Sequence, residues 1–272
     1  MIHMCKFRSH LSLFLIALLG YVLSVQTVQA ADDRWSQLKQ AYFENADIIS
    51  GDDVISLEAP KRAYDAATVP VVIKTMDPAR QIREVYLFVD QNPLPLAGIF
   101  RFTEEAGYWH SMETRIRINE YTNVRAIGIL ANGEMHMSER FVKASGGCSA
   151  PAMADMDVAM ARAGKMQLLL GEVNSESDLP FSEAVIKISH PNNSGMQFDQ
   201  ISRNYIPAFY VNNIKADIDG VDILTIETNF SMSENPMVRI AFTPESEARS
   251  LRVVALDSKG NEYQKSTDIS VE

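Results

Sequence analysis

The residue type best suited to covalent chemistry in this sequence is cysteine, and only two occur, Cys5 and Cys148. Cys148 follows Gly146 and Gly147 in a segment of small residues that contains no large apolar side chain. Such a segment offers little to bury a thiol, and its glycines permit wide backbone freedom. We therefore expect Cys148 to be exposed, mobile and able to bond covalently to another molecule. An incidental cysteine in a linker between domains is the other interpretation.

The first thirty residues have the pattern of a secretory signal peptide. Lys6 and Arg8 precede an apolar run over residues 11–23, and small residues at 28–30 form a cleavage site. The run is short for a membrane span, although a retained single-pass anchor is the alternative. We expect residues 1–30 to be removed, which places the mature protein in the periplasm or outside the cell, without membrane insertion.

Composition and charge exclude several classes of protein. The chain is 46% hydrophobic and 22% charged, with a formal net charge of −10, as in ordinary globular domains. Cleavage after Ala30 lowers the basic residues from 25 to 23 against 35 acidic ones, a formal charge of −12. An acidic chain without a basic stripe is not expected to bind nucleic acid. Cys5 would leave with the signal segment, so Cys148 has no intramolecular disulfide partner.

The rest of the chain is dominated by short β-rich runs in two groups. A short amphipathic helix is expected at residues 35–43, and residues 152–170 have a helix-favouring composition. Residues 131–134, which contain Asn132-Gly133, have the signature of a hairpin turn. The pattern predicts an all-β protein of two β-sandwich domains. The expected strands are 69–74, 85–90, 99–103, 114–119, 123–130 and 135–142, and then 184–189, 205–218, 221–227, 237–242, 250–256 and 262–269.

Short motifs, taken in order, carry a family resemblance. The first half resembles SoxY and the second half resembles SoxZ, the two subunits of a sulfur carrier. Each motif is weak alone, and their order along nearly the whole mature chain makes the match specific. The SoxY-like motifs are ISLEAP (55–60), ATVPV (67–71), NPLPLA (92–97) and GGC (146–148), and the SoxZ-like motifs are HP (190–191), YIPA (205–208), DG (219–220), SENP (233–236) and DSKG (257–260).

The resemblance implies a fused SoxYZ-like carrier built from immunoglobulin-like sandwiches. Its expected parts are a signal peptide (1–30), a SoxY-like domain (31–145), a partly helical linker bearing the cysteine (146–170) and a SoxZ-like domain (171–272). Cys148 would be the site of covalent sulfur attachment, with Gly146 and Gly147 as a flexible arm.

The resemblance also implies a function and its partners. The protein would be a non-catalytic carrier whose cargo is a covalent sulfur adduct, with no other cofactor. It would present this cargo to periplasmic sulfur-oxidation enzymes or to a quinoprotein dehydrogenase system, together with c-type cytochromes. Because Cys148 is followed by a second domain, it is tethered at both ends, and its partners would need an open groove to meet it.

A different class of function is suggested by soft metal donors. Cys148, Met135, His136, Met153 and Met156 are the donor types that periplasmic Cu(I) would prefer. Methionines at helical spacing are also common packing residues. A Cu(I)-binding protein, or a non-catalytic scaffold for quinoprotein dehydrogenase maturation, is therefore the alternative prediction.

Overall fold

The computed structural model describes residues 29–44, 46–77, 80–104, 107–151, 156–170, 181–243 and 250–268. The chain divides into two compact units, Met1–Ala46 and Asp47–Glu272. In the first unit the described residues form helix α2 (Gln29–Phe43), which confirms the helix expected at 35–43. No helix within the described ranges is long and apolar enough to cross a membrane.

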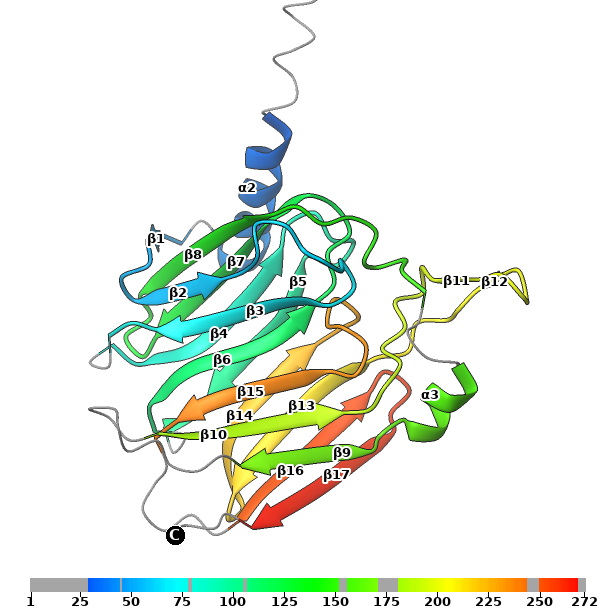
Figure 1. The fold of residues 1–272 in the computed structure, drawn as a ribbon. Coiled ribbons are helices and arrows are strands. Elements are labelled where there is room, and N and C mark those ends of the chain that lie inside the picture. Colours follow the sequence, from blue (N-terminus) through cyan, green and yellow to red (C-terminus); the bar gives the residue numbers. More distant parts are fainter. Residues whose placement is uncertain are drawn as a thin grey trace, which may run out of the picture. The chain divides into compact units, whose positions relative to one another are not determined.

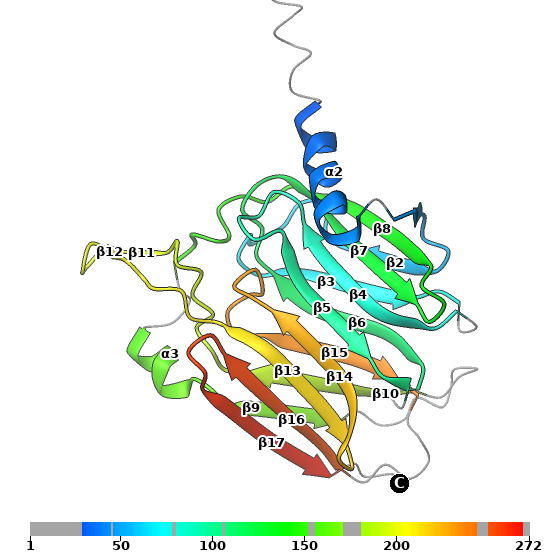
Figure 2. The same cartoon turned by 180° about the vertical axis from the view of Figure 1, so that it is seen from behind.

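The second unit is built from two β-sheets that face each other, as Figures 1 and 2 show from opposite sides. One sheet has nine strands in the order β1-β8-β7-β4-β5-β14-β13-β16-β17, and the other has six in the order β2-β3-β6-β15-β10-β9. Strands β11 and β12 form a separate small ribbon. Neighbouring strands run antiparallel, except that β1 pairs with β8 in parallel. The all-β sandwich architecture predicted from the sequence is confirmed.

The described part of the N-terminal half (residues 47–151) supplies strands β1 to β8, and the C-terminal half (residues 156–268) supplies β9 to β17. The first group is β1 (Ile48–Ser50), β2 (Ile55–Glu58), β3 (Val69–Thr75), β4 (Ile82–Val89), β5 (Leu96–Phe102), β6 (Trp109–Ile116), β7 (Thr122–Leu130) and β8 (Met135–Val142). The second group is β9 (Met166–Leu170), β10 (Ser182–Ile188), β11 (Phe198–Asp199), β12 (Asn204–Tyr205), β13 (Val211–Ile218), β14 (Val221–Thr228), β15 (Met237–Phe242), β16 (Ser250–Asp257) and β17 (Glu262–Asp268). Helix α3 (Met156–Arg162) precedes β9.

Both sheets continue from one half of the chain into the other. In the nine-stranded sheet β5 pairs with β14, with Phe100 opposite Ile226. In the six-stranded sheet β6 pairs with β15, with Thr114 opposite Val238. The buried apolar residues of both halves accordingly form one continuous cluster between the sheets. The two halves therefore share both layers and one core.

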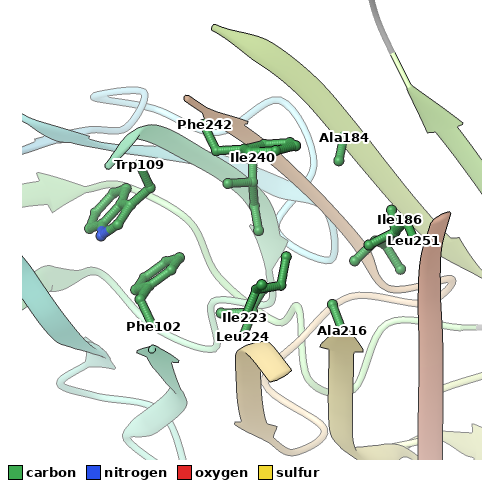
Figure 3. Close-up of a pocket in the computed structure, with 10 residues that line it drawn as sticks. All are labelled: Phe102, Trp109, Ala184, Ile186, Ala216, Ile223, Leu224, Ile240, Phe242 and Leu251. Atoms are coloured by element: carbon green, nitrogen blue, oxygen red, sulfur yellow. The ribbon is translucent and has the colours of Figure 1, made fainter. Parts of the chain in front are cut away.

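An apolar cavity lies in this shared core near the seam. Phe102 and Trp109 come from the N-terminal half, and they stack with ring centroids 4.6 Å apart. Figure 3 shows these two rings facing side chains of the C-terminal half, including Ala216 and Ile240. The volume of this cavity is about 30 Å³. The cavity is thus a small packing defect where the two halves meet.

One segment differs from the expectation of a helical connector at 152–170. Residues Met166–Leu170 form strand β9, which pairs with β10 at the edge of the six-stranded sheet. Helix α3 ends at Arg162, and Gly164 follows with a φ of 84°, a conformation that favours glycine. Helix propensity at 166–170 was overridden because burial of Met166 and Leu168 against the core requires the two-residue period of a strand.

Candidate functional site around Cys148

Cys148 lies in the segment that leaves β8, residues 143–151, which we call the cysteine segment. Its backbone runs beside the chain that continues β6. The Gly146 N–H donates to the carbonyl of Asn119 at 2.8 Å, and the Gly147 N–H donates to the carbonyl of Ile118 at 2.9 Å. A turn then closes where the Ser149 N–H donates to the Gly146 carbonyl at 3.2 Å. The backbone just before the thiol is therefore docked by the hydrogen bonds that Gly146 and Gly147 donate.

The two glycines before Cys148 have different physical roles. Gly146 has a φ of 80°, which favours glycine, and a Cβ there would meet open space. A Cβ on Gly147 would lie 2.0 Å from the carbonyl oxygen of Ala66 and 2.7 Å from that of Ile118. Both atoms belong to the backbone and cannot move aside. Gly147 is therefore required for close approach, and the flexible arm expected from Gly146-Gly147 is docked in this structure.

The thiol itself is buried. The exposed fraction of Cys148 is 0%, so the expectation of an exposed, mobile cysteine is wrong for this conformation. The neighbours in sequence are small, as noted above, but burial comes from residues far along the chain. The backbone of residues 66 and 118 lies on one side, and a loop of the C-terminal half covers another.

That covering loop follows β10 and contains residues 190–197. The Ser194 hydroxyl donates a short hydrogen bond to the carbonyl of Cys148. Ser194 is itself buried, and its N–H donates to the side-chain carbonyl of Gln197 at 3.0 Å. The C-terminal half thus holds the cysteine segment directly, through a residue 46 positions away.

A buried arginine shares this site. One terminal nitrogen of Arg117, Nη1, donates to the carbonyls of Asn192, Phe230 and Met232 at 2.6, 3.0 and 2.9 Å. Its Nε is buried and has no hydrogen-bond partner among the described residues. Arg117 lies on the chain that leaves β6, so it joins the N-terminal half to two loops of the C-terminal half.

Burial and charge act in opposite directions on the thiol. Burial raises the pKa of Cys148 to about 11, and the positive charge of Arg117 opposes that rise. Burial also lowers the pKa of Arg117, which the charge of a Cys148 thiolate would raise. Desolvation outweighs attraction at Cys148, so the docked cysteine is a protonated thiol at neutral pH. A protonated thiol is a poor nucleophile.

The soft donors of the copper alternative are divided between separate places. The Nε2 atom of His136 lies 2.8 Å from Glu134 Oε1 and 3.3 Å from Arg80 Nη2. Met135 lies beside it at the start of β8. Met156 Sδ instead accepts from Asn193 Nδ2 at 3.7 Å, in the loop that covers Cys148. Met153 lies outside the described residues.

Within the described part of the chain, no group of three His, Cys, Asp or Glu side chains could hold a metal ion. The structure therefore brings Met156 to the loop next to Cys148 and leaves His136 with Glu134 and Arg80.

Sequence reasoning missed the residues that enclose the thiol, chiefly Arg117 and Ser194. In the run Thr114 to Asn119, arginines alternate with isoleucines, a pattern typical of a strand with one solvent face. Arg115 is exposed as this pattern predicts, whereas Arg117 is buried by loops from the other half. No local signal distinguishes these two arginines.

Comparison with known families matches each half of the chain to one model. The model described as sulfur oxidation protein SoxY matches residues 39–148, and the one described as sulphur oxidation protein SoxZ matches residues 176–268. The first match ends at Cys148. No curated protein sequence matches the chain.

Two solved structures illustrate what the fold is similar to. The sulfur carrier protein SoxY from Chlorobium limicola f thiosulfatophilum has 21% identity, with 42% of this chain and 94% of that chain covered and a TM-score of 0.35. A superoxide reductase (neelaredoxin) from Ignicoccus hospitalis has 15% identity, with 35% of this chain and 94% of that chain covered and a TM-score of 0.30.

Proposed function

Because this chain joins a SoxY domain and a SoxZ domain and so belongs to the SoxYZ-like sulfur-oxidation carriers, we propose that it carries sulfur covalently on Cys148. Cys148 is the only cysteine of the described residues, and it is the last residue of the SoxY match. The two halves meet around this cysteine. Ser194 of the SoxZ half donates a hydrogen bond to the Cys148 carbonyl, and the Asn192 carbonyl of the SoxZ half accepts one from Arg117. This convergence is the observation that carries the proposal.

The docked conformation is proposed to be the closed state of the carrier. A buried thiol with a pKa of about 11 neither ionises nor meets solvent at neutral pH. Loading or unloading therefore needs the cysteine segment to leave its site. The bonds that must break are the two backbone hydrogen bonds of Gly146 and Gly147 and the contact from Ser194. Exposed, the thiol regains an ordinary pKa and becomes a competent nucleophile.

The covalent step requires partner enzymes. Joining the thiol sulfur of Cys148 to another reduced sulfur atom breaks the S–H bond, forms an S–S bond and releases the thiol proton to solvent and two electrons, which an oxidoreductase partner must accept. No step of this kind needs a catalytic group in the carrier itself. The protein is proposed to present the adduct and to leave catalysis to its partners. The quinoprotein dehydrogenase partner stays a prediction from the sequence.

The test is intact-mass spectrometry of the protein purified from its native cells, before and after reductant, with the Cys148 peptide mapped. We expect a mass increase equal to added sulfur or a sulfonate group on Cys148, removed by the reductant where it is linked through an S–S bond. The Cys148→Ser variant, purified in parallel, should carry no such adduct. The same spectrum tests export, because a mature chain beginning at Ala31 supports the proposed periplasmic location.

An unmodified thiol in cells that are actively oxidising sulfur compounds would overturn the carrier proposal. Copper that co-purifies with the wild-type chain and not with Cys148→Ser would favour the Cu(I)-binding alternative instead.

A further inference from the structure

A broad groove crosses the outer face of the six-stranded sheet, at the end where β6 and β10 finish and β9 and β15 begin. Its volume is about 520 Å³. It spans both halves of the chain, because β6 belongs to the N-terminal half and the other three strands to the C-terminal half. The lining residues are Arg115, Lys165, Met166, Gln167, Lys187, Ile188, Ser189, Asn235 and Met237.

The charges that line this groove are all of one sign. Arg115, Lys165 and Lys187 are exposed, and none of the lining residues is acidic. Within the described ranges, none of these three cations makes an ion pair or a side-chain hydrogen bond. The next row of the same face differs, because Arg239 binds Glu113 at 3.3 Å and Glu183 at 2.9 Å. Positive charge is therefore concentrated in the groove of a chain whose formal net charge is −10.

Strand register places Arg115 and Lys187 in one row, and Lys165, two residues before Gln167, lies beside Ser189, just past the end of β10. Lys187 lies opposite Met237 on β15 and opposite Gln167 on β9. Arg115 on β6 is one position beyond Thr114, which pairs with Val238. Because side chains two residues apart in a strand share a face, this row and the Arg239 row lie on the same solvent-facing side of the sheet.

The groove borders the loop that covers the thiol. At its rim, the Asn235 N–H donates to the His190 carbonyl at 2.9 Å, and His190 begins the loop that covers Cys148. Arg115 is two residues before Arg117, the buried arginine of the thiol site. Figure 1 shows the ends of β10 and the start of β9 on the same side of the molecule as the ribbon β11–β12, which extends from this loop.

We propose that this groove is the docking site for an acidic segment of a partner protein that reacts with Cys148. The inference rests on the proposed carrier function for the role of that partner. Like charges repel, so an acidic partner would be disfavoured by this chain everywhere except where cations gather. A groove that borders the thiol site selects partners in the orientation that brings their active site to Cys148.

An acidic protein segment fits the groove better than a small oxyanion does. The three cations stand on long, exposed side chains, and no buried donor converges on one point. Such an arrangement binds a single small anion weakly, whereas several carboxylates spaced along one segment can pair with the cations together. Binding should weaken as ionic strength rises, since exposed charges are screened.

The test measures binding of a labelled hexaglutamate peptide to the full chain by fluorescence anisotropy. We expect binding at low salt that is weakened about tenfold in the triple variant Arg115→Gln, Lys165→Gln, Lys187→Gln, because each exposed pair contributes modestly. A labelled hexalysine peptide should lose no affinity in the triple variant, because the groove offers it no carboxylate.

A second triple variant is the matched control for net charge. Lys215→Gln, Lys259→Gln and Lys265→Gln remove the same charge at surface positions that do not line the groove. This variant should bind hexaglutamate nearly as tightly as the wild type. Thermal melts of both variants establish that the fold is kept.

Equal losses in the two triple variants would overturn the proposal, because binding would then follow net charge alone. Displacement of the peptide by sulfate far beyond that by chloride at equal ionic strength would also overturn it, in favour of a small-anion site. These outcomes do not depend on sulfur at Cys148, so failure here leaves the mass-spectrometric test of the carrier function untouched.

Discussion

Substitution of Gly147 by alanine should force the cysteine segment out of its docked position. The new methyl group would lie 2.0 Å from the carbonyl oxygen of Ala66 and 2.5 Å from its carbon, distances that real Cβ atoms do not show. Both are backbone atoms of the chain that leads into β3. The cysteine segment must therefore move away from them, while the two sheets can keep their structure. The hydrogen bond from Gly147 to Ile118 would be lost with it.

The size of the effect follows from the pKa of the thiol. Docked, Cys148 has a pKa of about 11, and released it returns toward the ordinary value of 9.0. At pH 8 the thiolate fraction then rises from about 0.1% to about 10%, roughly a 100-fold increase. The same shift corresponds to about 3 kcal/mol of preference for the neutral thiol in the docked state.

The assay is the rate of alkylation of Cys148 by iodoacetamide as a function of pH. The wild type should react slowly, with a midpoint near pH 11, because a raised pKa keeps the thiol protonated until that pH. Gly147→Ala should react about 100-fold faster at pH 8, with a midpoint near pH 9. Gly146→Ala is the matched control: its Cβ meets open space, and the strain of a φ of 80° costs about 1 kcal/mol, which allows about a fivefold increase.

Equal rates for the wild type and Gly147→Ala, in proteins with unchanged circular dichroism, would refute this reasoning. A wild-type midpoint near pH 9 would equally show that the thiol is not held in a desolvated site.

Two further predictions concern stability. Burial, only partly offset by Asp257, lowers the pKa of His190 to about 4, below its unfolded value near 6.5, so the unfolded chain binds the extra proton as pH falls through this window. Because of this group, the free energy of unfolding should fall by roughly 2 kcal/mol between pH 7 and pH 5. Urea titrations should show that the free energy of unfolding depends less steeply on pH in His190→Gln than in the wild type. The same pH dependence in both proteins would contradict the assignment. Ala216→Val should fill part of the cavity in Figure 3 and raise the free energy of unfolding by about 0.5 to 1.5 kcal/mol. Ala126→Val, at a fully buried position outside that cavity, should lower the free energy of unfolding. A lower melting temperature in Ala216→Val would contradict the cavity interpretation.

Much of the architecture is encoded locally and was predictable. The turn signal at residues 131–134 predicts a returning strand, and β8 has the predicted bounds, Met135–Val142. The turn before it is also confirmed, with Gly133 at a φ of 85° and the Leu130 N–H donating to the Glu134 carbonyl at 2.9 Å. Strand β9 was missed because Met and Leu favour a helix in isolation, and only pairing with β10 decides otherwise.

The seam between the halves was beyond local reasoning. Two separate sandwiches and two sandwiches with continuous sheets have the same pattern of strands along the chain. The choice depends on which edges pair, and those pairs join residues as distant as Phe100 and Ile226. Which strand edges pair depends on residues far apart in the sequence, so a local sequence motif cannot predict it.

The sequence by itself determined which residue can carry a covalent adduct, since Cys148 is the only thiol left after the N-terminal segment. It did not determine the state of that thiol. Glycines before a cysteine are compatible with a flexible hinge and equally with close backbone approach, and the carbonyls of Ala66 and Ile118 decide for the latter at Gly147. Burial of Cys148, and with it the raised pKa, comes from the loops that the tertiary fold brings around the thiol. The small residues next to Cys148 in the sequence do not indicate that these loops are there.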